Sequence, residues 1–500
     1  MNFYNKIVNL WGAARMARIE NYADKASDIQ HSEFSNLIRK ATPTAFGKEY
    51  DFGTIHSYAD FASRVPVRDY VDFHPYIERM LKGESNVCWP GNLKWFAKSS
   101  GTTDAKSKFI PVTDDALQKC HYRGAQDAVI CYVASHPQTH ILKGKCLTLG
   151  GSKEISKVSH EIQTGDLSAI LIGNAPIWSD IFKTPNKDIA LLAKWEEKLG
   201  KIVNATISEN VTSLAGVPSW FLILLKHLLE VAGKNNLHEV WPNLELFMHG
   251  GINFTPYREQ YKQLCPKGIH FMETYNASEG FFGIQTEENT DMQLMLDYGI
   301  FFEFVPLSEI GNPFPKAYTI DNVELNTDYA IVISTNGGLW RYVIGDTIRF
   351  TSRNPHRFII SGRTKHYINA FGEELMIANA EYGLRKACEQ TGAEIREYTA
   401  APVFMNIQEQ GCHQWLVEFS KQPSSATLFV EVLDNALREV NSDYDAKRYK
   451  NITLATPQLT MARDGLFYDW LKSKDKLGGQ NKVPRLSNNR EYIDSLLKMN

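Results

Sequence analysis

Apolar and polar positions along the chain follow two different periods. In the first 90 residues, apolar side chains recur at spacings of three and four, as at Leu10, Ala13, Ala14 and Ala17. That spacing places them on one face of a helix, so residues 1–90 are predicted to be mostly helical. Beyond residue 90, short β-rich runs alternate with longer helical ones.

Several strand candidates in this alternating stretch run into a polar or glycine turn. The candidate strands are LKWFAK at 93–98, SKFIPV at 107–112, KCLTLGG at 145–151, LELFMHGG at 244–251 and IHFMETYNASEG at 269–280. Helices are predicted from an N-cap at Asp114 to about Ser135, over 188–202, and over 219–232 with Gly233 at the end. This alternation indicates an α/β fold with mixed sheets. Ligands are expected at the turns 99–104, 249–253 and 275–280, because open α/β sheets bind ligands beyond their strand ends.

The pattern changes near residue 328. Short strands follow, broken by the turns Asn-Gly-Gly at 336–338 and Ile-Gly-Asp at 344–346, and two more strands flank a turn at 362–365. A helix is predicted to start near Glu373. Strands at 396–406, 413–420 and 452–460 and helices at 424–440 and 489–499 then complete a small α+β domain. We therefore expect a large N-terminal α/β domain over 1–362 and a small mobile domain over 363–500.

Composition narrows the class of protein. A chain of 500 residues is too long for one core, and a formal net charge of −3 gives no electrostatic reason to expect a nucleic-acid partner. The longest apolar run, 220–225, is far short of a membrane span. Seven cysteines without C-x-x-C spacing indicate a reducing compartment, with neither a disulfide framework nor a zinc site. The N-terminus lacks the apolar segment of a signal peptide, so a cytoplasmic protein is expected.

The stretch WFAKSSGTTDAKSKFIPVT, residues 95–113, is the first candidate for chemistry. Hydroxyls, backbone N–H groups in a tight turn and a lysine together can surround phosphate oxygens. The residues that supply them are Ser99, Ser100, Gly101, Thr102, Thr103, Lys106 and Lys108. The loop is not a Walker loop, because G-x-x-x-x-G-K-[ST] is absent. Read alone, an ordinary Ser/Thr turn explains it better.

Three further stretches carry candidate groups. In ETYNASEG, Tyr275 offers a flat ring face, Ser278 a hydroxyl and Glu279 an oxygen ligand suited to magnesium. In WRYVIGDTIRF, Asp346 can accept two hydrogen bonds from a ribose diol. In GGQNKVPRL, Lys482 lies on a glycine-flanked segment and could stabilise phosphate charge. Each alone has a plainer interpretation: a polar strand end, a hairpin turn or a solvated surface charge.

The four stretches in this order are far more specific than any one of them alone. A hydroxyl-rich loop, Tyr-x-x-Ser-Glu, Arg-Tyr-x-x-Gly-Asp and a late lysine together resemble the adenylate-forming superfamily of acyl and aryl ligases. Within it, the chain resembles the auxin-responsive acyl-acid amido synthetase family in its bacterial form, over nearly its whole length. The stretches TAFGKEYDF, VPVRDYVDFHPYIERMLKGE, FAKSSGTTDAKSKFIPVT, TYNASEG, RYVIGDTIRF and NKVPRL carry the likeness.

The resemblance implies roles for particular residues. The loop 99–103 would hold the ATP phosphates, and Gly250 and Gly251 would line the adenine slot, where only glycine lets a ring lie against backbone. Tyr275 would border adenine, Ser278 would contact the α-phosphate or carboxylate, Glu279 would bind magnesium, and Asp346 would bind the ribose. Lys482 would be the catalytic lysine. The roles of Arg341 and Tyr342 in the third motif stay open.

The resemblance places the motif lysine and the hinge less directly than the other residues. Relatives usually have glycine after Gly-Thr-Thr, where this chain has Asp104 and Ala105, so Lys108 is preferred over Lys106 as the motif lysine. The stretch SGRTKHYINAFGEEL resembles the superfamily hinge, placed at Arg363, Thr364 and Lys365. Acyl-pocket candidates are Phe254, Phe281 and Phe282, although an aromatic residue taken alone is more commonly part of the core.

The implied reaction has two halves. A carboxylic acid attacks the α-phosphorus of ATP, giving acyl-adenylate and pyrophosphate, and an amine, expected to be an amino acid, then attacks the acyl carbon and releases AMP. A coenzyme A ligase sharing the first half is the alternative enzyme. A nucleotide-dependent binding module is the non-enzymatic one, although it would be expected to have lost Lys482 or Glu279. The sequence leaves the acid, the amine and the oligomeric state open.

Overall fold

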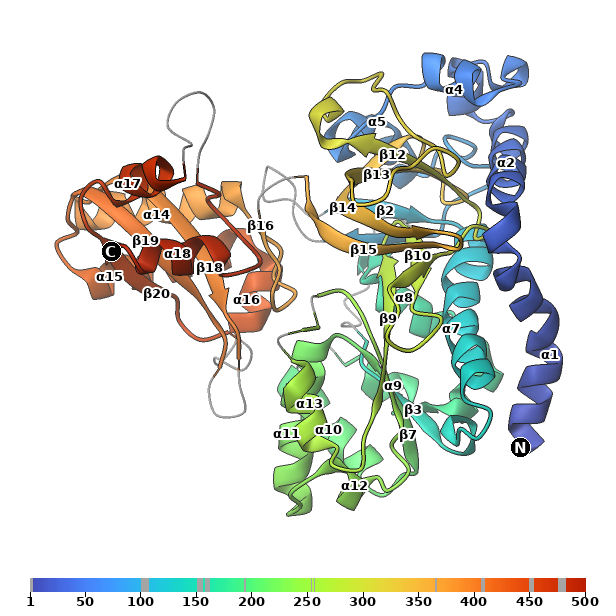
Figure 1. Cartoon of the computed structure of the whole chain (residues 1–500), viewed down its shortest axis with the longest axis horizontal. Helices are drawn as coiled ribbons and strands as arrows, with labels where there is room; N and C mark the ends of the chain where they lie inside the picture. Colours follow the sequence, from blue (N-terminus) through green and yellow to red (C-terminus); the bar gives the residue numbers. More distant parts are fainter. Residues whose placement is uncertain are drawn as a thin grey trace.

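A computed structural model describes residues 3–99, 108–150, 156–157, 162–192, 195–252, 254–255, 257–364, 367–405, 410–448, 454–474 and 483–500 of the chain. Figure 1 shows a large N-terminal body beside a smaller C-terminal one. No helix among these residues is long and apolar enough to cross a membrane. All seven cysteines are free thiols.

The first 90 residues are helical, as predicted. They form α1 (Phe3–Glu20), α2 (Tyr22–Ala41), α3 (Ala45–Glu49), η1 (Phe52–Thr54), α4 (Tyr58–Arg64) and α5 (Tyr70–Leu81). Helix α1 packs along α7 (Tyr122–Ser135) at one side of the large body (Figure 1). Helix α2 packs against β12 (Ile300–Pro306), so the N-terminal helices cover the large sheet.

An eleven-stranded mixed sheet forms the centre of the large body. Its parallel part runs through β6 (Lys183–Thr184), β3 (Lys145–Thr148), β7 (Val211–Gly216), β8 (Leu246–His249) and β9 (His270–Ala277). The antiparallel part continues through β10 (Gly280–Ile284), β11 (Met292–Leu294), β15 (His356–Arg363), β14 (Tyr342–Arg353), β13 (Asp328–Thr335) and β12. The β9–β10 hairpin therefore joins the two parts.

A second sheet, in the order β2-β1-β5-β4, carries the hydroxyl-rich stretch. Its strands are β1 (Trp95–Ser99), β2 (Lys108–Val112), β4 (Ser156–Lys157) and β5 (Gln163–Gly165). Strands β1 and β2 pair antiparallel, with Ser99 opposite Lys108. Helix α8 (Leu167–Gly173) packs against β1.

The C-terminal body is built on a three-stranded sheet. Strands β18 (Glu394–Val403), β19 (Cys412–Lys421) and β20 (Gln458–Ala462) form the sheet, and β16 (Tyr367–Ile368) and β17 (Leu375–Met376) form a separate pair. Its helices are α14 (Ile377–Thr391), α15 (Ala426–Val440), α16 (Ser442–Arg448), α17 (Leu466–Ser473) and α18 (Glu491–Leu497). The predicted α/β class with a smaller α+β body is confirmed.

The two bodies share one apolar core. It joins buried residues of α11 (Pro218–Ala232) and α13 (Arg258–Leu264) to residues of the C-terminal sheet and helices. Hydrogen bonds also cross the same interface: Tyr257 Oη donates to the Ala370 carbonyl at 2.8 Å, Gln260 Nε2 donates to the Met405 carbonyl at 2.8 Å, and Ser219 Oγ donates to the Phe371 carbonyl at 3.4 Å. The smaller body is therefore docked on α11 and α13.

Two helix predictions need correction. The helix before Ser135 is capped by Thr113, whose Oγ1 accepts from the Ala116 N–H at 3.0 Å, so Asp114 is its first residue and not the cap. The predicted helix 188–202 is two helices, α9 (Lys187–Ala190) and α10 (Trp195–Thr206). The apolar pattern continues through the residues between α9 and α10, so the pattern alone does not show that the helix is interrupted there. Helix α11 ends as predicted, with Gly233 in the left-handed region at φ +62°.

Two further predictions near the domain junction were wrong. Residues 344–346 are not a turn, because β14 runs unbroken from Tyr342 to Arg353, with Gly345 at φ +102° inside the strand. The helix predicted near Glu373 begins at Ile377, since β17 comes first and the Glu373 carboxylate accepts from the Phe371 N–H at 2.7 Å. Helices α16 and α17 were not predicted at all.

Candidate active site

A cleft of about 2620 Å³ lies at the strand ends of the parallel part of the sheet. Thr148, Gly216, His249 and Ala277, the last residues of β3, β7, β8 and β9, all line it. Residues of α7, of the β14–β15 hairpin and of the C-terminal body line the other sides. Ligands of open α/β sheets bind beyond the carboxyl ends of the strands, so this is the expected place for a substrate.

The two described ends of the hydroxyl-rich loop lie at the cleft. Ser99 ends β1 and Lys108 begins β2, and both line the cleft. The predicted phosphate-binding residues between them, Ser100, Gly101, Thr102 and Thr103, lie outside the described residues. The paired strands therefore place both ends of the loop at the cleft.

Gly250 and Gly251 follow β8 and also line the cleft. A Cβ atom on Gly250 would lie 2.2 Å from the Thr274 carbonyl oxygen, and Gly251 has φ +83°. Both positions thus demand glycine for the backbone itself, because the chain turns tightly against β9. The resulting bare backbone surface is compatible with the predicted adenine slot.

Ser278 and Glu279 form the two-residue turn of the β9–β10 hairpin. Ala277 pairs with Gly280, so the turn is tight, and both turn residues line the cleft. Burial raises the pKa of the Glu279 carboxyl, and the positive charge of Lys108 acts against this shift. No other described residue makes a hydrogen bond or ion pair with the Glu279 carboxylate that would compete with a cation. An available carboxylate of this kind fits a magnesium ion.

Tyr275, Asp346 and Arg363 form a chain of contacts across three strands. The Tyr275 hydroxyl donates to Asp346 Oδ2, and Arg363 forms an ion pair with Asp346 Oδ1. Asp346 and Arg363 are register partners on β14 and β15. All three line the cleft, although the Tyr275 ring also packs edge-on against Phe282 at 4.9 Å. The predicted adenine and ribose contacts are therefore next to each other.

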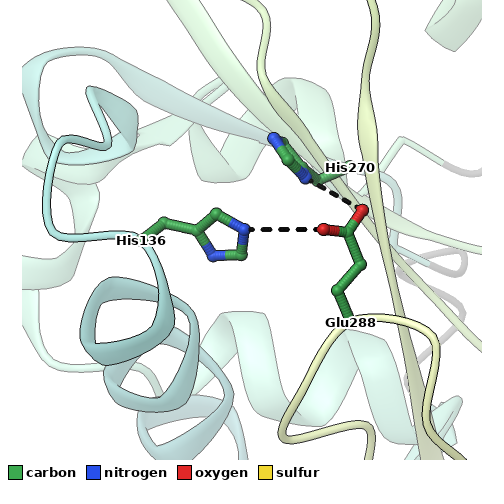
Figure 2. Close-up of side chains that lie close together, drawn as sticks. All are labelled: His136, His270 and Glu288. Atoms are coloured by element: carbon green, nitrogen blue, oxygen red, sulfur yellow. Dashed lines mark hydrogen bonds and ion pairs between the residues drawn. The ribbon is translucent and has the colours of Figure 1, made fainter.

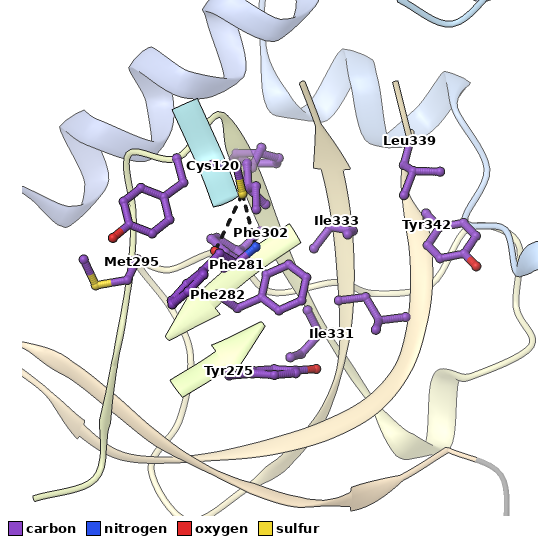
Figure 3. Packing of buried hydrophobic residues seen from close by; sticks show 14 of the residues in the cluster. Cys120, Tyr275, Phe281, Phe282, Met295, Phe302, Ile331, Ile333, Leu339 and Tyr342 are labelled. Atoms are coloured by element: carbon purple, nitrogen blue, oxygen red, sulfur yellow. Dashed lines mark hydrogen bonds between the residues drawn. The ribbon is translucent and has the colours of Figure 1, made fainter. Parts of the chain in front are cut away.

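The three acyl-pocket candidates occupy different places. Phe281 lines the cleft, and its backbone N–H donates to Cys120 Sγ at 3.1 Å (Figure 3). Phe282 is fully buried among core aromatics, and Phe254 stacks on His249 at 3.9 Å; neither lines the cleft. Phe254 and Phe282 are therefore core aromatics. Of the three candidates, Phe281 alone stays a candidate for the acyl pocket.

Arg341 and Tyr342, left without roles by the sequence, are buried. Arg341 forms a fully buried ion pair with Glu303 at 2.7 Å and donates to the Val65 carbonyl at 2.7 Å. It therefore joins the α4 region to the sheet. The Tyr342 hydroxyl has no hydrogen-bond partner among the described residues (Figure 3).

The hinge and lysine candidates are only partly described. Arg363 ends β15 and also contacts Glu374 Oε1 at 3.6 Å, while the Thr364 N–H donates to the Gly345 carbonyl at 2.8 Å. Lys365 and Lys482 lie outside the described residues. Pro484 and Leu486, shortly after Lys482 in the chain, line the cleft.

Lys447 and His121 are among the titratable groups in the cleft that the sequence did not point to. Lys447 on α16 has its Nζ 3.9 Å from the centre of the Trp220 ring, and burial lowers its pKa to about 8. His121 contacts Asn276 Oδ1 through Nδ1 at 3.0 Å, and burial lowers its pKa to about 4, so the imidazole is neutral near pH 7. Neither had a local signal: Lys447 lies in an ordinary charged helix, and His121 reaches Asn276 across 155 residues.

Comparison with known proteins identifies the family. Residues 15–269, more than half of the chain, match the GH3 family N-terminal domain. The chain belongs to the GH3 family. Residues 293–363 match its central domain and residues 378–491 its C-terminal domain. The recognition made from the motifs is confirmed.

Relatives in plants extend along most of this GH3 chain. Indole-3-acetic acid-amido synthetase GH3.3 of Arabidopsis thaliana is 21% identical, with 93% of this chain and 90% of the relative covered. Indole-3-acetic acid-amido synthetase GH3.8 of Oryza sativa subsp. indica is 23% identical, with 93% and 89% covered. The expected class of enzyme, an acyl-acid amido synthetase, is confirmed.

Solved structures support the fold. The GH3.15 acyl acid amido synthetase has a TM-score of 0.61 and 18% identity, and covers 97% of this chain and 95% of that chain. A 2-hydroxyisobutyryl-CoA ligase in complex with 2-HIB-AMP and CoA has a TM-score of 0.54 and 12% identity, with 97% and 92% covered. The GH3 chain therefore has the fold of adenylate-forming ligases.

Proposed function

We propose that the cleft activates a carboxylic acid with ATP and magnesium, and then transfers the acyl group to an amino acid. The gathering of Ser99, Lys108, Glu279 and Asp346 around one cleft carries the proposal. These residues come from two sheets and lie far apart in the sequence. A binding surface for nucleotide, cation and phosphate needs this combination of donors, carboxylates and positive charge.

The nucleotide would lie across the ends of β8 and β9. We assign the adenine to the bare backbone at Gly250 and Gly251, bordered by Tyr275, and the ribose diol to the Asp346 carboxylate. The loop from Ser99 to Thr103, with Lys108, would hold the phosphates. Ser278 at the hairpin tip would contact the α-phosphate or the substrate carboxylate.

Glu279 would hold the magnesium. Apart from the backbone N–H of Glu279 itself, no described residue competes for the carboxylate, and oxygen ligands are those that magnesium prefers. When bound there, magnesium neutralises charge on the phosphate oxygens. Lys108, which already acts electrostatically on Glu279, is positioned to do the same from β2.

The first half of the reaction depends mainly on alignment and charge neutralisation. The substrate carboxylate attacks the α-phosphorus of ATP, and the bond from that phosphorus to the pyrophosphate oxygen breaks. We assign the stabilisation of the developing charge to Lys482 and the loop donors. Removing one such contact costs on the order of 10²–10³ in rate.

The second half needs access for an amine. The amine nitrogen attacks the acyl carbon, AMP leaves with the former carboxylate oxygen, and the nitrogen loses a proton. We propose that the domain boundary at residue 362 and the hinge at Arg363, Thr364 and Lys365 allow the C-terminal body to rotate between the two halves, withdrawing Lys482.

One experiment tests the proposal at both halves. Acid-dependent pyrophosphate exchange across aryl, indolyl and aliphatic acids would establish adenylation and identify the class of acid. The active acid is then incubated with ATP and either amino acids or coenzyme A. Amide formation is the expected result, and thioester without amide would establish the alternative, a coenzyme A ligase.

The Lys482→Ala variant tests the assignment of the lysine. Exchange should be abolished while ATP binding, measured by calorimetry, is mostly retained. Exchange at the wild-type rate would refute the role. We also propose a cytoplasmic location, supported by the seven free thiols, which are typical of a reducing compartment.

A further inference from the structure

His136, His270 and Glu288 lie close together (Figure 2). They are at the opposite end of β9 from the Ser278–Glu279 turn, and none of them lines the cleft. Each offers one ligand atom, and these atoms all lie within 4.8 Å of one another. They come from the end of α7, the start of β9 and the loop after β10. We propose that these three side chains form a binding site for a zinc ion, independent of the nucleotide site and of the proposed function.

The orientation of His136 is set by its backbone. His136 Nδ1 lies 3.2 Å from the Tyr132 carbonyl oxygen, which can only accept, so Nδ1 carries the proton of a neutral ring. The lone pair is then on Nε2, the atom that lies toward Glu288. A hydrogen bond from the second ring nitrogen to a carbonyl is the usual support of a metal-binding histidine. The His136 ring also stacks on Tyr132 at 4.3 Å.

The distances leave room for an ion. His136 Nε2 is 3.9 Å from Glu288 Oε2, too far for a hydrogen bond, and a neutral Nε2 and a carboxylate are both acceptors. Two ligand atoms at about 2.1 Å from a tetrahedral zinc lie roughly 3.4 Å apart. A cation can therefore bind both atoms if His136 Nε2 and Glu288 Oε2 move slightly closer together.

His270 completes the set on the other side of the carboxylate. Its Nδ1 lies 3.2 Å from Glu288 Oε1 and donates to it when no metal is bound. Zinc binding at Nδ1 moves that proton to Nε2, so the neutral ring exchanges one tautomer for the other. The His270 side chain is 38% exposed, so solvent can carry the proton.

The loop that carries Glu288 is held in place. Arg357 on β15 forms an ion pair with Glu287 at 2.7 Å and donates to Thr290 Oγ1 at 2.9 Å and to the Asp291 carbonyl at 3.0 Å. Gln285 Nε2 donates to the Thr290 carbonyl at 2.8 Å. The backbone on both sides of Glu288 is thus fixed before a metal arrives, and the cost of ordering is reduced.

The ligand types select the metal. Two imidazoles and one carboxylate suit zinc, whereas magnesium prefers oxygen ligands in an octahedron. His270 and Glu288 also border a cavity of about 440 Å³, through which water can reach a fourth position on the ion. A bound zinc would link α7 to β9, the strand that leads to Tyr275 and the Ser278–Glu279 turn.

The test is metal binding by the full chain. Protein stripped with a chelator is titrated with zinc chloride in a calorimeter, and cobalt(II) serves as a spectroscopic probe of tetrahedral nitrogen and oxygen ligands. We expect one zinc per chain, a rise in melting temperature with zinc, and no displacement by excess magnesium. Absence of zinc binding would overturn the proposal and leave the cluster an ion-paired group only.

Variants locate the ion. His270→Ala and Glu288→Gln should each weaken zinc binding by about tenfold or more. His227→Ala is the matched control, because His227 also faces a glutamate, Glu230 at 3.6 Å, but belongs to no three-ligand group among the described residues, and it should bind zinc like the wild type. Glu288 lies on a loop, so its variant should fold normally, as circular dichroism can check. Unchanged affinity in a folded Glu288→Gln variant would place the zinc elsewhere and overturn the proposal.

Discussion

The Tyr275 hydroxyl donates a hydrogen bond to the same Asp346 carboxylate that Arg363 holds by an ion pair. Strands β9, β14 and β15 are thereby joined at one charged group. Asp346 is the proposed ribose ligand and Arg363 the first residue of the proposed hinge. The proposed nucleotide site and the proposed hinge therefore share one carboxylate.

Replacement of Tyr275 by phenylalanine tests the first of these contacts. A hydrogen bond to a charged group contributes about 1.5–3 kcal/mol, so loss of the hydroxyl should raise the KM for ATP roughly tenfold or more. Pyrophosphate exchange measures the change. Tyr76→Phe, which loses a comparable bond to Glu49 at an exposed site, should leave the KM unchanged. An equal effect in both variants would show that the Tyr275 contact has no special role.

Glu279→Gln should separate stability from activity. Burial raises the pKa of Glu279, so the folded state holds its proton more tightly than the unfolded state. Stability therefore falls as the pH rises from the ordinary glutamate pKa through the raised pKa, and the full cost is present above the raised pKa. The variant should melt higher than wild type at neutral pH. Its advantage should shrink as the pH falls through the raised pKa and vanish below the ordinary glutamate value.

Magnesium dependence supplies the second readout for Glu279. The carboxylate must be ionised to bind the cation, so wild-type exchange should weaken as the pH falls through the same raised pKa. Above the raised pKa, Glu279→Gln should exchange more slowly than wild type by on the order of 10²–10³, and this difference should shrink as the pH falls and wild type loses its own activity. A variant that melts lower at neutral pH, or retains exchange, would contradict the assignment.

Arg341→Ala tests a structural role for the third motif. Removing one member of a fully buried ion pair leaves Glu303 without its counter-charge and should cost about 3–5 kcal/mol in the free energy of unfolding, as measured with urea. Arg349→Ala breaks the half-exposed pair with Asp328 and should leave the free energy of unfolding nearly unchanged, because solvent screens such a pair. Similar losses in the two variants would refute the distinction.

Gly250→Ala tests the tight turn after β8. Its Cβ would lie 2.2 Å from the Thr274 carbonyl, so the backbone must shift, and both melting temperature and ATP binding should fall. Gly200→Ala is the control, because no atom lies within 4 Å of the added Cβ and alanine favours the helix α10. Calorimetric ATP titration of both variants distinguishes a local requirement from a general sensitivity to alanine.

Features that depend on a few neighbouring residues could be predicted from the sequence. Strand ends, the glycine pair and the hairpin tip at Ser278 and Glu279 are local features, and their approach to one cleft follows from strand order. The contact between Asp346 and Arg363 depends on the register of β14 and β15, which no local pattern specifies. The turn predicted at 344–346 was also wrong for a non-local reason. Gly345 and Asp346 have the composition of a turn, and only pairing with β15 keeps these residues inside a strand.

The shared core of the two bodies restricts how the enzyme can move. Tyr257 and Gln260 are hydrogen-bonded across it, and apolar side chains of α11 and α13 continue into the C-terminal sheet. Lifting the smaller body away would expose that surface to water, at about 25 cal/mol for each Å². We therefore expect shear: the smaller body slides over α11 and α13 and exchanges one set of apolar neighbours for another, while the surface between them stays dry.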